Sequence, residues 1–347
     1  MSIPRKKSVT AKDIARVCGI SQATVSYVMN NKEGKKISEA TRQLVLKTAR
    51  ELNYVPNSTA RSMRTNRSMS IGVVSGRNNL TIGFSHILRG IKEYLDKAGY
   101  SITLLTDDGR ERLKDSPEQH EYVRYYRSSR IDGILFLFYE MEDSVMKMLE
   151  EEHIPFFLVD ESGVWCGSQQ QHTLLEEGIA QAVTLCREKR FLNLGFFSSQ
   201  FGDTLFSRKW GLFSRLLAEN HPQAQLHRCV FQVKDISVEA LTAQILQNLE
   251  CGQYDAVITP NPRMGWAVQS AILQKNFSLP LSTYHICLAA SSIFQLVYPT
   301  ITCLDMPLEE MGTYAARQIL RRIAGQPVET HSFTCQLKES TSAYEGT

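Results

Sequence analysis

Hydrogen-bonding side chains recur along residues 21–31, a short stretch near the N-terminus that is predicted to be helical. Glutamine can form two hydrogen bonds to adenine, whereas alanine offers only a methyl contact to thymine. Serine, threonine and asparagine side chains bind phosphate oxygens, which positions a protein on a duplex without reading its sequence. Gln22, Ala23 and the polar groups around them are therefore candidates for a DNA-binding surface.

Two short helices joined by a glycine-containing turn would position this surface. Two apolar faces recur at helical spacing, one formed by Ile14, Ala15 and Val17 and the other by Val25, Val28 and Met29. Between them Gly19 can adopt a positive φ, and Ser21 is placed to cap the second helix. The pattern predicts a helix-turn-helix, whose second helix enters the DNA major groove.

Capping signals extend this motif on both sides. Thr10 and Asp13 resemble a capping box that opens the first helix. Ser38 is placed to cap a third, amphipathic helix. The inward face of that helix is predicted to comprise Ala40, Leu44, Val45, Thr48, Ala49 and Leu52.

Charge is distributed unevenly along the 347 residues. Residues 1–67 hold 14 Lys and Arg against four acidic residues, a net charge of +10. The rest of the chain holds 25 basic and 32 acidic residues, a net charge of −7. A basic segment on an acidic remainder is typical of a nucleic-acid reader attached to a second domain.

Several other classes of protein are disfavoured by the sequence. Eight cysteines are scattered singly, without the spacing of a metal site, which favours reduced thiols in the cytoplasm. The N-terminus lacks the apolar segment of a signal peptide, and no apolar run is long enough to cross a membrane. No nucleophile elbow, phosphate-binding glycine loop or metal cluster indicates an enzyme, and we expect no cofactor.

The N-terminal stretch resembles the DNA-binding headpiece of the lactose-repressor family of bacterial transcription regulators. The matching residues are Thr10–Ala15, Gly19–Ser21, Ala23–Ser26, Asn30, Ser38, Thr41, Arg42 and Leu52–Asn57. The resemblance implies base reading by Gln22, Ala23 and Tyr27. It implies DNA positioning by Thr10, Ser21, Thr24, Ser26, Asn30, Lys35, Lys36, Ser38 and Thr41. Many relatives carry arginine in place of Tyr27, so their guanine contact is not carried over; for Thr24 and Ser26 the alternative is an exposed polar helix face.

The segment after the third helix resembles the family's hinge. Its candidate residues are Asn57, Ala60, Arg61, Met63 and Arg64. A helix this short is unstable alone in water, so we expect it to order only when packed or bound. In the family, paired hinge helices insert a leucine into the minor groove, and Met63 falls on that position. The alternative is a plain linker.

Alternating strands and helices follow from Met69 onward, which predicts parallel sheets covered on both faces. The strands are expected at 70–74, 100–105, 131–138, 154–159, 191–197, 230–233, 256–259, 285–289 and 301–304. We divide the chain into a helix-turn-helix headpiece (8–56), a hinge helix and linker (57–67) and a body (68–347). Lobe one is expected at about 68–160 and 295–328, and lobe two at about 161–294 and 329–340.

The body resembles the periplasmic-binding-protein fold, two doubly wound α/β lobes with a ligand cleft between them. Asp160, Arg208 and Asn261 match three positions that commonly hold a sugar in relatives, but a fourth, acidic position is lost in Leu288–Ser292. Arg77, Phe84 and Trp266 are further candidates to pair or stack with an effector. The alternatives are turn capping by Asp160 and Asn261, a salt bridge of Arg208, and core packing of the aromatic residues.

The resemblance implies a cytoplasmic transcriptional repressor that binds a pseudo-palindromic double-stranded DNA operator as a homodimer. Its effector is expected to be a small molecule, such as a sugar or sugar derivative. The lost acidic position favours a less hydroxylated, more apolar or anionic compound, because unpaired buried polar groups are costly. The alternative is a ligand-independent repressor with a degenerate cleft. Residues 330–347 lack leucine heptads, so a dimer is expected instead of a tetramer.

Overall fold

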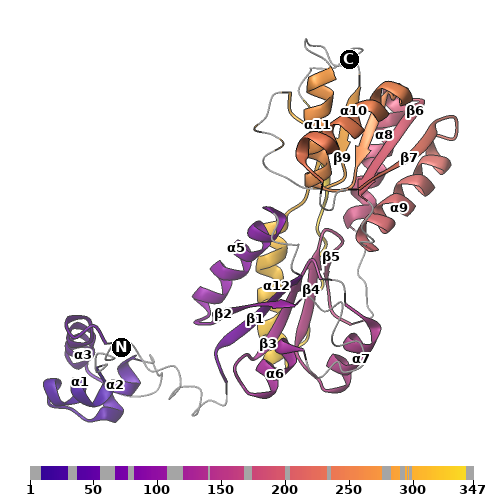
Figure 1. Cartoon of the computed structure of the whole chain (residues 1–347). Helices are drawn as coiled ribbons and strands as arrows, with labels where there is room; N and C mark the ends of the chain where they lie inside the picture. Colours follow the sequence, from indigo (N-terminus) through magenta and orange to yellow (C-terminus); the bar gives the residue numbers. More distant parts are fainter. Residues whose placement is uncertain are drawn as a thin grey trace. The chain divides into compact units, whose positions relative to one another are not determined.

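A computed structural model describes residues 9–29, 37–54, 67–76, 82–107, 120–139, 141–167, 174–199, 204–232, 236–275, 283–289, 294, 296 and 299–340. The chain divides into two compact units, Met1–Met69 and Ser70–Thr347, which we call the head and the body. Figure 1 traces both units along the sequence.

The head consists of three helices, α1 (Ala11–Cys18), α2 (Gln22–Met29) and α3 (Glu39–Glu51). Their core is formed by Ile14, Ala15, Val25, Val28, Val45 and Ala49. Three residues expected to face inward are exposed instead: Val17 by 61%, Leu44 by 46%, and Ala40. A helix turns by about 100° per residue, so Val17 and Leu44 lie roughly 100° from the centre of the buried faces.

The body contains two sheets, each with its own helices. The first has the strand order β2-β1-β3-β4-β5, from β1 (Ser70–Gly76), β2 (Ser101–Asp107), β3 (Gly133–Leu137), β4 (Phe156–Asp160) and β5 (Gly163–Trp165). The second has the order β11-β10-β9-β8-β6-β7, from β6 (Asn193–Ser199), β7 (Gln225–Phe231), β8 (Ala256–Thr259), β9 (Tyr284–Cys287), β10 (Thr302–Asp305) and β11 (Gln336–Lys338). All pairings are parallel except those of β5 and β11 (Figure 1). The predicted two-lobed α/β body is confirmed.

The helices of the body are α5 (Ile82–Lys97), α6 (Glu121–Arg127), α7 (Asp143–Glu151), α8 (Leu174–Glu188), α9 (Thr204–Asn220), α10 (Val238–Gly252), α11 (Pro262–Lys275) and α12 (Leu308–Ile323). We call the first sheet with α5, α6, α7 and α12 lobe one, and the second sheet with α8, α9, α10 and α11 lobe two.

The order of the sheets corrects two of the predicted lobe limits. Strand β10, expected in lobe one, pairs with β9 of lobe two, with Cys303 opposite Cys287. Strand β5, expected in lobe two, pairs antiparallel with β4 of lobe one. The hairpin forms because only Glu161 and Ser162 separate the two strands, and a connection this short permits only antiparallel pairing.

Helix α12 completes lobe one from near the end of the chain. It packs along α5 and against β3 and β4 (Figure 1). Glycines allow the two helix backbones to approach closely. A Cβ atom at Gly90 would lie 1.9 Å from the carbonyl oxygen of Glu309, and one at Gly312 would lie 2.1 Å from that of Ile87. The absence of a side chain at Gly90 and Gly312 is therefore what allows α5 and α12 to pack this closely.

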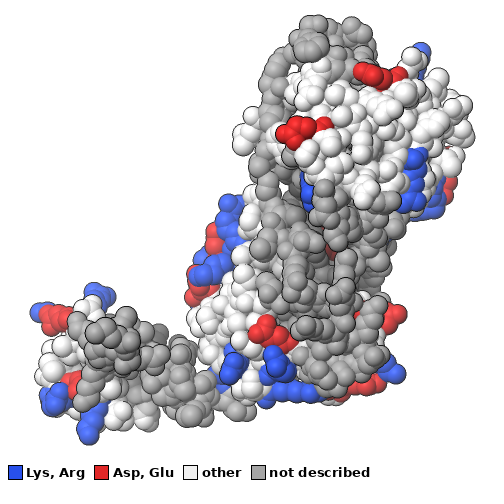
Figure 2. All heavy atoms as spheres, in the orientation of Figure 1, with Lys and Arg blue, Asp and Glu red and all other residues white. Residues whose placement is uncertain are grey.

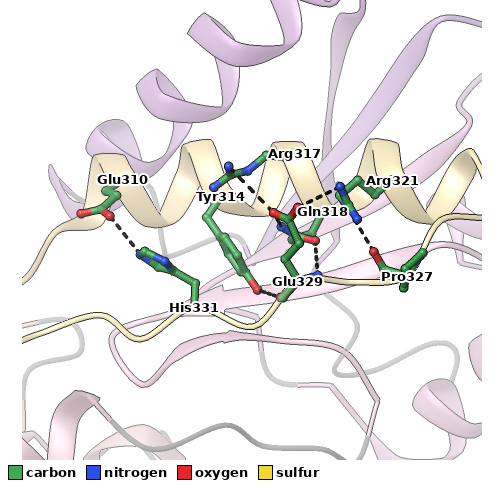
Figure 3. A network of polar contacts seen from close by, with 8 residues as sticks. All are labelled: Glu310, Tyr314, Arg317, Gln318, Arg321, Pro327, Glu329 and His331. Carbon is green, nitrogen blue, oxygen red and sulfur yellow. Dashed lines mark hydrogen bonds and ion pairs between the residues drawn. The ribbon is translucent and has the colours of Figure 1, made fainter.

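An extended segment, residues 326–335, leads from α12 to β11 of lobe two, and we call it the strap. Glu329 fixes it to α12. Its carboxylate lies 2.9 Å from Arg321 Nη1, and its backbone N–H donates to Gln318 Oε1 at 2.9 Å (Figure 3). The Tyr314 hydroxyl donates to the Glu329 carbonyl, and His331 lies 3.0 Å from Glu310. The last crossover between the lobes is therefore pinned to lobe one over much of its length.

Candidate DNA-binding surface and effector site

The helix-turn-helix is held by local hydrogen bonds at each helix start. The N–H of Thr10 donates to Asp13 Oδ2 at 3.0 Å, so the predicted capping box is present. Gly19 adopts a φ of +66° at the end of α1, as the turn requires. Ser21 Oγ then accepts from the N–H of Thr24 at 3.1 Å and caps α2.

Helix α2 buries one face and presents the other. Val25 and Val28 are buried in the head core, whereas Gln22 and Ala23 are exposed. Tyr27 is half-buried. Gln22 and Ala23 therefore project from the first turn of α2. A recognition helix makes its base contacts from this turn.

The polar residues around α2 and α3 form a repeated arrangement. The hydroxyl groups of Ser21 and Thr24 lie 2.9 Å apart, and those of Ser38 and Thr41 lie 2.8 Å apart. In both pairs the serine also caps its helix. Ser26 is half-buried. The other predicted DNA contacts, Asn30, Lys35, Lys36, Asn57, Ala60, Arg61, Met63 and Arg64, lie outside the described residues.

In the body, Asp160 ends β4 and accepts a hydrogen bond at Oδ1 from the N–H of Ser162 at 2.6 Å. The pKa of the Asp160 carboxyl is raised to about 7, mainly by burial and to a lesser extent by the charge of Glu161. Hydrogen bonds from Ser162 and the charge of Arg208 act in the opposite direction. Asp160 thus makes the turn-capping contact that was predicted as the alternative to ligand binding. The charge of Arg208, in lobe two, also acts on it.

Arg208 and Lys209, in the first half of α9, both contact the β4–β5 turn of lobe one. Arg208 Nη1 donates to Ser162 Oγ at 3.1 Å. Lys209 Nζ pairs with the Glu161 carboxylate and donates to the Pro260 carbonyl at 2.6 Å. The structure therefore brings Asp160 and Arg208 to one junction between the lobes, linked through Ser162.

The remaining effector candidates are placed less closely together. Asn261 Oδ1 accepts from the N–H of Met264 at 2.9 Å and caps α11, which was its structural alternative. Trp266 packs against Phe294 of lobe two, with 5.7 Å between ring centroids, and Phe84 is buried in α5. Arg77 lies outside the described residues.

Three residues of this junction were not predicted: Glu161, Ser162 and Lys209. Glu161 directly follows Asp160, and Lys209 directly follows Arg208. This adjacency to predicted site residues was the one signal in the sequence that could have indicated them. Side-chain exposure of Lys209 is 1% and of Glu161 is 10%, which sequence alone did not suggest for residues of these types.

The described surface of the body carries charges of both signs. On the face of the body shown in Figure 2, basic and acidic side chains lie beside one another. The described ion pairs of the body include Arg127–Glu152, at 2.5 Å, and Lys92–Asp96. Such pairing does not produce the single-sign surface that attracts a polyanion.

Comparison with known proteins agrees with the folds of both units. Residues 10–57 match the lacI family of bacterial regulatory proteins, and residues 184–341 match the periplasmic binding protein-like domain. The head is therefore a lacI-family DNA-binding domain, and the chain has the two domains of a DNA-binding transcriptional repressor of the LacI type.

Curated relatives match all or part of the chain. The HTH-type transcriptional repressor PurR of Vibrio parahaemolyticus is 25% identical over 328 residues, which cover 94% of this chain and 96% of the relative. PurR of Photobacterium profundum is 30% identical over 152 residues, covering 44% of this chain and 43% of the relative.

Solved structures share the fold at lower sequence identity. A lac repressor dimer bound to operator and the anti-inducer ONPF superposes with a TM-score of 0.77 at 20% identity, covering 97% of this chain and all of that one. The transcriptional regulator CelR in complex with cellobiose gives a TM-score of 0.60 at 20% identity, covering 96% of this chain and 99% of that one. Among the described residues, no helix is long and apolar enough to cross a membrane.

Proposed function

We propose that this repressor reads a pseudo-palindromic operator as a homodimer, and that a small-molecule effector bound in the body controls its operator affinity. The observation that carries the DNA-reading part is the exposure of Gln22 and Ala23 on the first turn of α2, beside the buried Val25 and Val28. A homodimer presents two such helices, which matches the symmetry of a palindromic site. The lac repressor relative was solved as a dimer on its operator.

Selection from randomised DNA duplexes tests this reading. The full-length chain should select a symmetric sequence, and Gln22→Ala should lose its preference at one base pair in each half-site, because alanine cannot bond an adenine edge. An unchanged selected sequence for Gln22→Ala would show that Gln22 does not read bases.

Met63→Gly tests the hinge: it should weaken operator binding more than binding to random DNA, whereas equal losses would exclude a wedge in the minor groove.

The effector part of the proposal is supported by the junction of Asp160, Ser162 and Arg208 between the lobes. A guanidinium group can bind a carboxylate or phosphate group with two parallel hydrogen bonds. Asp160, with its pKa near 7, can either accept or donate a hydrogen bond around neutral pH. This pair of groups suits an effector with an anionic or acceptor group and few hydroxyls.

Thermal-shift measurements on the full chain test for such a ligand, with neutral sugars, sugar phosphates and aromatic carboxylates as probes. A compound that binds the folded body and not the unfolded chain raises its melting temperature, and the increase grows with the ratio of ligand concentration to Kd. Arg208→Ala should abolish the shift and the response of operator affinity to that compound, while operator affinity without it stays the same. A retained response would show that Arg208 does not contact the ligand.

A ligand-independent repressor is the second candidate function. It is favoured by the turn-capping bonds of Asp160 and Asn261, which already use one oxygen of each side chain. In that case none of the probes would shift the melting temperature, and operator affinity would be the same with and without each of them.

A further inference from the structure

We propose that Glu161 and Lys209 form a buried ion pair that ties the two lobes of the body together, whether or not an effector is bound. We call it the interlobe pair. The inference does not depend on the proposed effector, because Glu161, Lys209 and the Pro260 carbonyl that Lys209 also contacts all belong to the chain itself.

The contacts of Lys209 join three separate segments of the body, counting the helix that carries it. Glu161 lies in the turn between β4 and β5, and therefore belongs to lobe one. Lys209 lies on α9, which packs on the second sheet where Trp210 meets Phe196 with 5.2 Å between ring centroids. The Pro260 carbonyl, which accepts from Lys209 Nζ at 2.6 Å, follows β8 of lobe two. One ammonium group thus bonds to both lobes.

Burial distinguishes this pair from the other described ion pairs. Its side chains are 1% and 10% exposed. By contrast, Arg215 and Glu176, which join α9 to α8 within lobe two at 2.5 Å, are 48% and 45% exposed. Exposed pairs contribute little because water and salt screen them, whereas removing one partner of a buried pair leaves an unpaired charge in the interior.

Neighbouring contacts align the same two segments. Arg208 donates to Ser162 Oγ at 3.1 Å, and the N–H of Ser162 donates to Asp160 Oδ1. Residues 160–162 of lobe one therefore meet residues 208–209 of lobe two through consecutive polar contacts. Such contacts have defined donor and acceptor geometry, so they fix the position of the hairpin more narrowly than apolar packing would.

Desolvating two charges is costly, and apolar residues of similar size often stabilise a fold equally well. The pair is thus better explained by the geometry it imposes than by net stability. The Lys209 ammonium is paired with a carboxylate of the chain itself, so it needs no anionic ligand to balance its charge. The interlobe pair therefore sets the spacing of the two lobes.

Hydrogen–deuterium exchange of the full chain, without DNA or effector, tests the tie. In Lys209→Met, amide exchange should accelerate about tenfold or more in the segment 157–166 of lobe one and also in the segment 256–264 of lobe two. The control Arg215→Met removes a cation from the same helix and breaks a pair within one lobe. It should leave exchange in both segments unchanged within about twofold.

The double variant Glu161→Leu/Lys209→Met separates a tie from general stability. It leaves no unpaired charge, so it should fold even where Lys209→Met does not, with a melting temperature within about 5 °C of the wild type. Its exchange should nevertheless accelerate in both segments. Faster exchange in lobe two alone, or wild-type exchange in segment 157–166 of the double variant, would overturn the proposal. Neither result would bear on whether an effector binds.

Discussion

The head and the body hold their functional residues in place by bonds of different range. In the head, the pairs Thr10–Asp13, Ser21–Thr24 and Ser38–Thr41 each join residues three positions apart. In the body, the bonds from Arg208 and Lys209 reach Ser162, Glu161 and the Pro260 carbonyl, 46 to 51 positions away.

This difference determines what a substitution can disturb. A local cap contributes to one helix, and its loss affects the unit that contains that helix. A bond between distant segments depends on the whole tertiary arrangement, and its loss affects every element that the bond aligns. Substitutions in the body should therefore have larger and more widespread effects than matched substitutions in the head.

The largest effect is expected at the contact between α5 and α12. Gly312→Ala should destabilise the body by roughly 3 kcal/mol or more, because its Cβ would lie 2.1 Å from the Ile87 carbonyl oxygen, an atom of the backbone that cannot rotate away. Urea unfolding followed by circular dichroism measures the change. Gly211→Ala on α9 is the control: nothing lies within 4 Å of the added Cβ, so it should stabilise by up to about 1 kcal/mol. Equal effects of the two variants would contradict the close packing of α5 on α12.

An intermediate effect is expected from Asp160, whose pKa of about 7 in the folded protein lies above its ordinary value of 3.8. The folded state then binds more protons than the unfolded state between these values, so this group lowers stability as pH rises from about 4 to 7. Asp160→Asn removes that penalty and keeps an oxygen for the N–H of Ser162. Above pH 7 the variant should be more stable than the wild type, by roughly 2–4 kcal/mol.

The unfolding free energies of the wild type and of Asp160→Asn are measured in urea from pH 4 to 8. Their difference isolates the contribution of Asp160 to the pH dependence of stability. His285 contributes a slope of the opposite sign to both proteins, because burial lowers its pKa from 6.5 to about 3 and stability from this group is lost as pH falls through that range. A difference that does not change with pH would show that Asp160 is ionised throughout.

The smallest effect is expected in the head. Ser38→Ala removes the hydroxyl that accepts from the N–H of Thr41 at 3.2 Å and should cost about 1 kcal/mol, confined to the head. Gln43→Ala, which breaks an exposed bond to Glu39 on the same helix, should change stability by less than about 0.5 kcal/mol. Hydrogen exchange of α3 and of the body measures both. Accelerated exchange in the body of Ser38→Ala would contradict the local nature of the cap.

The three helices of the head could be predicted from the sequence because their signals are local. The capping residues, the left-handed Gly19 and the helices all follow from residue types at short spacing. The errors, Val17, Leu44 and Ala40, concern how far a buried face extends around a helix, which depends on what packs against it.

In the body, the alternation of strands and helices was predicted, but β5 was not predicted as a strand and β10 was assigned to the wrong lobe. A strand's own residues indicate that it is extended, and only its partners decide the sheet to which it belongs. Asp160 and Arg208 were found through family resemblance. Glu161 and Lys209 were missed because a charged side chain becomes a buried partner only when the fold brings its counterpart close.

The late position of α12 in the chain has a consequence for synthesis on the ribosome. While lobe two is being translated, β3 and β4 of lobe one have emerged, but the helix that packs against them and against α5 has not. Lobe one therefore exposes apolar surface until residues 308–323 leave the exit tunnel. Lobe two then still lacks β11, at residues 336–338. Lobe one is complete only once α12 has been made, and lobe two only once β11 has been made, so a chain that terminates before residue 308 contains neither lobe in full.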